Sequence, residues 1–160
     1  MPSYEKSIDV NVPVSTAYNQ WTQFESFPAF MEGVEWVHQL DDRHTHWTTS
    51  IGGVEREFDA EITEQHPDER VAWRTTSGPK QAGVVTFHRI DDRTTRVHLQ
   101  MEFDPEGVVE NIGAVSGVVG SRIEGDLGRF KEFIETPGGE TGAWRGDIAA
   151  APQRDIAGLG

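Results

Sequence analysis

Strict alternation of apolar and polar side chains is the feature that most constrains what this chain can fold into. Every second residue is apolar from 97 to 103, and the same pattern occurs in residues 58–62 and 8–12. A period of two places all the apolar side chains of a segment on one face of a β-strand. Further strand-like runs occupy residues 46–51, 71–75, 84–88 and 34–40. The run at residues 34–40 does not keep one period. The sequence therefore predicts seven strands.

Short turn motifs separate most of these runs, which predicts an antiparallel sheet. Residues 40–45 and 90–95 are near copies that contain Asp-Asp-Arg, and Gly52-Gly53, residues 66–69 and residues 77–80 mark the other connections. Adjacent aspartates on an exposed turn cannot converge on one substrate atom, and aspartate is a preferred turn residue. We therefore interpret both aspartate pairs as turn residues and not as a catalytic pair.

Helical patterns occur in two places. Residues 15–24 and 26–31 predict two short helices between the first two strands, with Pro28 suited to the first turn of the second. From residue 108 the apolar positions recur every three or four residues until 134, and Thr136-Pro137-Gly138-Gly139 ends the pattern. This predicts a helix over residues 107–135, long enough to cross a whole sheet.

The predicted long helix contains glycines that lower its intrinsic stability. Gly113, Gly117 and Gly120 fall on one stripe, and each costs up to about 1 kcal/mol relative to alanine in a helix interior. Two explanations stay open at this point. Either the stripe allows close approach of the helix to the sheet, or it leaves room for a ligand between them.

Composition and charge exclude several classes of function. The 160 residues carry a formal charge of −13 and contain no cysteine. Nucleic acids and anionic membranes need clustered positive charge, and disulfides, thiolate nucleophiles and cysteine-based zinc sites need cysteine. Neither a signal peptide nor an apolar run long enough to span a membrane is present. We expect a cytoplasmic protein without nucleic-acid partners or stable membrane insertion, and the sequence leaves its oligomeric state open.

The domain organisation follows from where the helical pattern stops. Residues 1–136 are predicted to form one domain, and residues 137–160 a tail rich in glycine and alanine. Trp144 is the exception in this tail, and we expect its side chain to pack back against the domain.

Particular segments carry a resemblance to a known superfamily. They include Val12-Pro13-Val14-Ser15-Thr16-Ala17-Tyr18-Asn19-Gln20-Trp21, residues 24–34, residues 82–87, residues 126–135 and Gly142-Ala143-Trp144-Arg145-Gly146. Together they resemble the START-like, helix-grip superfamily (SRPBCC), within it the bacterial polyketide cyclase/dehydrase and lipid-transport group. The resemblance implies an α+β helix-grip fold, in which a seven-stranded curved antiparallel sheet surrounds a long C-terminal helix. It also implies a cavity under that helix that holds a lipid, quinone or polyketide-like molecule.

The alternation pattern indicates which side chains would line such a cavity. Aromatic walls with few polar groups suit a small apolar ligand. The predicted ligand-binding residues are Phe27, Phe30, Met31, Trp47, Thr49, Phe58, Ala60, Trp73, Thr75, Phe87, Met101, Ile112 and Ser116.

Candidates for catalysis are few. Arg56 shares a face with Phe58, whereas the alternation favours an outward position for the other weak candidate, His88. His44 and His46 lie two apart on one strand, but a surface pair is the simpler interpretation without a third ligand. We expect no metal and no cofactor. Three functions stay open: a binding protein for a hydrophobic small molecule, a polyketide cyclase or aromatase-dehydrase, and an interaction domain whose interior is filled by its own side chains.

Overall fold

The structure is a computed structural model that describes residues 3–51, 54–78, 80–103, 112–136 and 141–149. Side chains are described for all of these except residues 51, 54, 103 and 112–122. The elements follow one another as β1 (Ser3–Val10), α1 (Val14–Trp21), the 3₁₀ helix η1 (Phe24–Ala29), β2 (Val34–Gln39), β3 (His44–Ile51), β4 (Val54–His66), β5 (Arg70–Ser77), β6 (Gln81–Asp91), β7 (Thr94–Phe103) and α2 (Ile112–Glu135).

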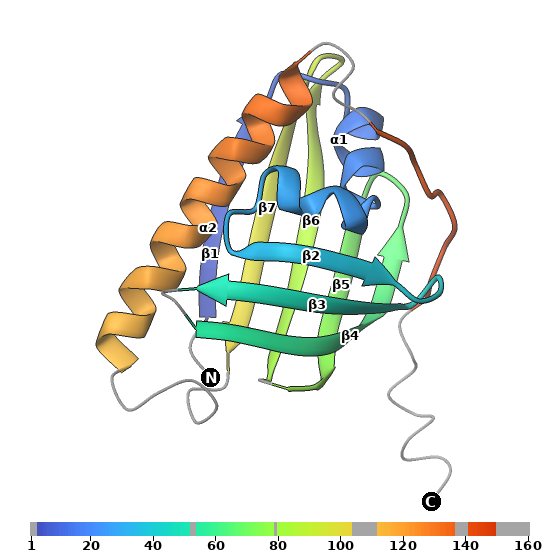
Figure 1. The fold of residues 1–160 in the computed structure, drawn as a ribbon. Helices are drawn as coiled ribbons and strands as arrows, with labels where there is room; N and C mark the ends of the chain where they lie inside the picture. Colours follow the sequence, from blue (N-terminus) through green and yellow to red (C-terminus); the bar gives the residue numbers. More distant parts are fainter. Residues whose placement is uncertain (1–2, 52–53, 79, 104–111, 137–140, 150–160) are drawn as a thin grey trace, which may run out of the picture.

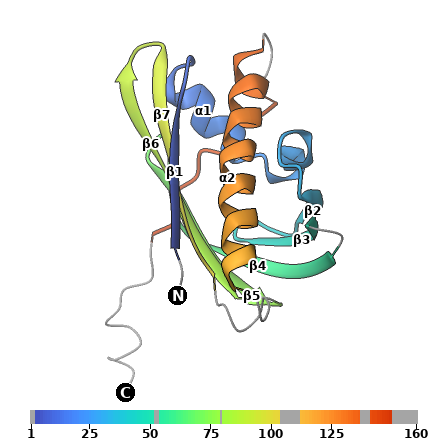
Figure 2. The ribbon, with the colours of Figure 1, turned by 90° about the vertical axis from the view of Figure 1, so that its left-hand side faces the viewer.

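The seven strands form one antiparallel sheet in the order β1-β7-β6-β5-β4-β3-β2. The sheet bends strongly, so that β2, β3 and β4 cross in front of the upright strands, and α2 lies in the hollow (Figure 1). Figure 2 shows α2 between the two halves of the sheet. The predicted helix-grip fold is confirmed. The second short helix is a 3₁₀ helix that contains Pro28, whose ring cannot donate a backbone hydrogen bond.

Local irregularities explain where the sequence pattern was ambiguous. The pairing of β2 with β3 shifts between Val34 and Trp36, and such a bulge moves later residues to the other face. The two Asp-Asp-Arg turns fold alike, because Asp41 Oδ1 accepts the Arg43 amide and Asp91 Oδ1 accepts the Arg93 amide, each at 2.8 Å. This confirms that the first aspartate of each pair stabilises a turn.

The C-terminal half of α2 packs against the sheet with one apolar stripe. Ile123, Leu127, Phe130 and Ile134 are all buried in the main core. A polar contact also joins this half of α2 to the residue after η1: Arg129 Nε donates to the Phe30 carbonyl at 3.1 Å. The glycine stripe lies in the part of α2 whose side chains are outside the described set.

Residues 141–149, called the strap here, lie against α1 and the end of β4 (Figure 1). Ile148 is 3% exposed and exchanges two backbone hydrogen bonds of 2.8 Å with Gln65. Arg145 pairs with Asp68 at 2.8 Å and lies 5.5 Å from the centre of the Tyr18 ring. As expected, the Trp144 side chain packs against the core.

One contact of the strap depends on protonation. Asp147 and Glu64 bond the two ring nitrogens of His66 at 2.5 and 3.0 Å, and these contacts raise the pKa of His66 in the folded protein. A raised folded pKa stabilises the fold fully below the unfolded pKa of about 6.5, and this contribution is lost as the pH rises through the folded pKa.

We therefore expect the His66→Gln variant to differ most from the parent in stability at about pH 5.5 and much less near pH 8, on either side of the histidine pKa range. Urea denaturation of both proteins across this pH range measures the difference. A difference that does not change with pH would show that protonated His66 does not hold the strap.

Candidate functional site

The inner face of the sheet changes from packed to partly exposed between two neighbouring rows of side chains. Backbone pairing places Leu99, Val85 and Val71 side by side in one row, and these residues are 5%, 0% and 0% exposed. The next row, formed in the same way, contains Tyr4, Met101, Gly83 and Trp73, which are partly exposed, and it ends at Ile62, the β4 partner of Trp73, which is 2% exposed. The core thus fills one end of the hollow more completely than the other.

Aromatic rings fill the closed end. The Phe130 ring of α2 lies edge-on to Trp21 and Phe30, with centroid distances of 5.0 and 5.2 Å. Phe27 and Phe30 were expected to contact the ligand, and both are almost fully buried in this cluster. The reason is that η1 turns its phenylalanines inward against Trp21 and α2. Phe87, another expected lining residue, is also a buried member of this core.

A second aromatic group lies under β3 and β4. The rings of Trp47 and Phe58 are nearly parallel, at an interplanar angle of 8° and a centroid distance of 6.0 Å. Trp47 Nε1 donates to Thr45 Oγ1 at 2.7 Å, which fixes the indole. Thr49 and Ala60, both buried, follow Trp47 and Phe58 on the same face. This part of the inner face offers apolar and aromatic surface with few free polar groups.

The remaining expected lining residues lie in different environments. Thr75 is on the inner face, but its hydroxyl bonds both the amide and the carbonyl of Gln81, so it joins β5 to β6. Met31 is partly buried against the core. Ile112 and Ser116 belong to α2, in the stretch whose side chains are outside the described set.

The two catalytic candidates lie on opposite faces of the sheet. Arg56 follows the inner-face alternation with Phe58 and is partly buried, and no hydrogen bond or ion pair joins it to the described residues. His88 is exposed on the outer face and contacts Thr86 at 3.0 Å. His88 is therefore removed as a candidate, because a side chain on the outer face cannot reach the hollow.

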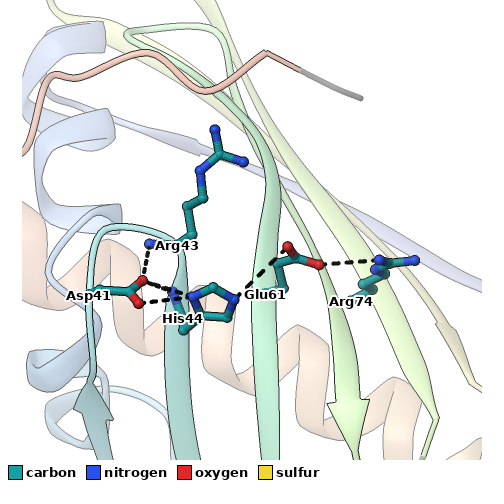
Figure 3. A network of polar contacts seen from close by, with 5 residues as sticks. All are labelled: Asp41, Arg43, His44, Glu61 and Arg74. Atoms are coloured by element: carbon teal, nitrogen blue, oxygen red, sulfur yellow. Dashed lines mark hydrogen bonds and ion pairs between the residues drawn. The ribbon is translucent and has the colours of Figure 1, made fainter. Parts of the chain in front are cut away.

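The outer face of β3, β4 and β5 carries a polar network instead of a site. His44 contacts Asp41 at 2.9 Å and Glu61 at 4.0 Å, and Glu61 pairs with Arg74 at 3.2 Å (Figure 3). In the next row His46 hydrogen-bonds to Asp59 and Glu57. Both contacts raise the pKa of His46, and the contact with Asp59 has the larger effect. Among the described residues no group of three or more such side chains is arranged to hold a metal ion.

Sequence reasoning missed two features beside the hollow. The first is Gly83, whose missing side chain leaves space that the Trp73 indole occupies. A glycine inside a strand pattern was the available signal, since it often marks a close approach. The second is Tyr18, fully buried at the closed end, whose hydroxyl accepts a 3.0 Å bond from Gln65 Nε2. Burial raises the pKa of Tyr18, so this hydroxyl stays protonated.

Comparison with solved structures supports the fold. The structure of a START superfamily protein from Mycobacterium smegmatis matches with a TM-score of 0.76 and 12% identity, covering 84% of this chain and 98% of that one. The Zhui aromatase/cyclase from Streptomyces sp. R1128 matches with a TM-score of 0.73 and 14% identity, covering 84% and 93%. At these identities the likeness concerns the fold alone. None of the described helices is both long and apolar enough to cross a membrane.

Sequence comparison identifies the family. An uncharacterized 17.2 kDa protein of Streptomyces lincolnensis is 61% identical over 149 residues, which cover 92% of this chain and 99% of that protein. The family model described as polyketide cyclase / dehydrase and lipid transport matches residues 10–132. This match spans most of the sheet and of α2. The chain therefore belongs to the polyketide cyclase/dehydrase and lipid transport family.

Proposed function

We propose that this chain is a cytoplasmic protein that binds a hydrophobic small molecule, such as a lipid, quinone or polyketide-like compound, between the inner face of the sheet and α2. The observation that carries the proposal is that Tyr4, Met101, Gly83 and Trp73 stay partly exposed on the inner face, beside the buried side chains of Leu99, Val85 and Val71. Apolar surface exposed on a concave face is typical of ligand pockets.

The wall of the proposed site is chemically suited to such a ligand. Trp47, Trp73 and Met101 all pack against the core while remaining partly exposed. Burying one methylene group against such a surface contributes about 0.8 kcal/mol, so a ligand of modest size gains enough to bind. Hydroxyl groups in this region, such as those of Thr45 and Thr75, already have partners within the protein, which favours apolar over polar ligands.

Filling the site tests the proposal. Met101→Trp adds an indole to the partly exposed row, and we expect it to weaken binding of 6-acetyl-2-dimethylaminonaphthalene at least about tenfold, equivalent to about 1.4 kcal/mol. Fluorescence titration measures the affinity, and circular dichroism checks the fold. Ile90→Trp adds the same group to an exposed residue near the end of β6 and should bind the probe like the parent. Equal affinity of parent and Met101→Trp would contradict the proposed position.

A second candidate function is catalysis of ring closure or dehydration of a polyketide in the same site. Arg56 favours it, because this guanidinium lies on the inner face without a partner among the described residues. Arginine donates two hydrogen bonds in a fixed fork and so suits substrate carbonyl groups. The name of the Zhui aromatase/cyclase indicates the reaction class to be tried first.

Replacing Arg56 separates this function from binding alone. We expect Arg56→Met to abolish any cyclase turnover of a poly-β-keto substrate mimic, followed by mass spectrometry, while the naphthalene probe still binds. Arg74→Met on the outer face is the matched control and should keep turnover, because this side chain pairs with Glu61 outside the hollow. Turnover that survives in Arg56→Met at the parent rate would remove Arg56 as a catalytic candidate.

A further inference from the structure

Trp73 and Gly83 form a fitted pair across β5 and β6. The two residues are direct backbone partners, and a Cβ atom on Gly83 would lie 2.5 Å from Trp73 Cζ2 and 2.9 Å from Cε2. Carbon atoms in contact normally lie about 3.5–4.0 Å apart. The indole therefore occupies the place that a side chain at position 83 would take. Only glycine allows the ring to lie this close to the backbone of β6.

The position of this pair in the sheet gives it a consequence for the hollow. On one side of Trp73 lies the packed row that contains Val71 and Val85, both 0% exposed. In its own row, across Gly83, lies the partly exposed Met101. The indole thus stands at the boundary between the solid core and the proposed ligand space.

We propose that Trp73, seated on Gly83, sets the depth of the ligand space and thereby the largest apolar ligand that the protein accepts. This inference rests on the proposed binding function and adds a specificity-determining residue to it. The sheet backbone lies behind the ring, so a side chain at position 83 displaces the indole toward α2 and makes the space shallower. Shortening Trp73 removes the ring that lies over Gly83 and makes the space deeper.

A homologous series of probes measures this depth. The 6-acyl-2-dimethylaminonaphthalenes from acetyl to dodecanoyl keep one fluorophore and lengthen only the apolar chain. Affinity should rise about fourfold for each methylene group that enters the site, which is the ratio that corresponds to 0.8 kcal/mol. Beyond the depth of the space the increase should stop, and the chain length at that point is the limit.

We expect Gly83→Ala to move this limit to a shorter chain and to weaken binding of the longest well-bound probe at least about fourfold, the value of one methylene. Trp73→Ala should move the limit to a longer chain, and Trp73→Phe should move it the same way by less, which provides a milder variant if the first does not fold. Gly128→Ala is the matched control, because nothing lies within 4 Å of a Cβ at that position, and it should keep the parent's limit.

The outcomes separate this inference from the proposed function. If the parent, Gly83→Ala and Trp73→Ala all bind the acetyl probe and show the same limiting chain length across the series, Trp73 does not set the depth. The binding function would still stand. If the parent binds no probe of any length, the proposed function fails and this inference fails with it. Opposite shifts in Gly83→Ala and Trp73→Ala, with no shift in Gly128→Ala, are the result that supports it.

Discussion

Replacing Phe130 by alanine should lower the free energy of unfolding by about 3–5 kcal/mol, the usual cost of removing a buried aromatic ring. Phe130 is 0% exposed and touches both Trp21 and Phe30. It therefore joins α2 to α1 and η1 inside the bend of the sheet. Movement of one neighbour cannot fill the space that the ring leaves, because these contacts come from two separate segments, α1 and the residue that follows η1.

Chemical denaturation of the purified variant measures this loss. Phe133→Ala is the matched control, since this ring is only partly buried and contacts Phe30 from the rim of the cluster. We expect it to cost clearly less than Phe130→Ala. If both variants lost the same free energy of unfolding, the apolar stripe that contains Phe130 would not be the surface through which α2 packs against the core.

Ile148→Ala should cost about 2–5 kcal/mol, the range for shortening a buried aliphatic side chain. Ile148 is 3% exposed, and its backbone bonds to Gln65 hold it at the end of β4. The backbone bonds remain in the variant, so the loss reports only the burial of the side chain. Leu40→Ala removes a similar side chain that is 62% exposed and should change stability by no more than about 0.5 kcal/mol.

A loss below about 1 kcal/mol in Ile148→Ala would fall outside the range for a buried aliphatic position. The strap would then be a loosely attached tail. Thermal unfolding of the two variants beside the parent decides between these outcomes.

The strands were predictable because each has local information. The period of two in β4 and β7 marks one face as buried, and aspartate in the turns after β2 and β6 stops each strand. The helical spacing from Ile123 to Ile134 likewise predicts the stripe of α2 that the sheet buries. These signals need no knowledge of distant contacts, and the structure confirms the fold that they predict.

Features that depend on contacts between distant residues were not predictable in the same way. The strap is held by pairs such as Arg145 with Asp68 and Ile148 with Gln65, and glycine and alanine around it hide that signal. Phe27 and Phe30 have the composition of a pocket rim, yet the turn of η1 directs both into the core. The contact between Trp73 and Gly83 depends on which residues of β5 and β6 pair with each other. A single sequence does not show this pairing.

The site is predictable only as a face of the sheet. Alternation correctly places Trp47, Phe58, Trp73 and Met101 on the inner side. Which of these side chains contact a ligand, and which ligand it is, stays a prediction, because partial exposure arises from the three-dimensional packing of rows and not from the pattern of any one strand.

The tryptophans provide the most direct test of binding in the hollow. Trp47 and Trp73 lie on the inner face, Trp36 is 40% exposed on the outer face, and Trp144 belongs to the strap. In ¹H–¹⁵N spectra recorded during titration with the acetyl naphthalene probe, we predict that the indole resonances of Trp47 and Trp73 shift, while those of Trp36 and Trp144 stay in place. Shifts confined to Trp36 or Trp144, with Trp73 unchanged, would contradict a ligand site between the sheet and α2.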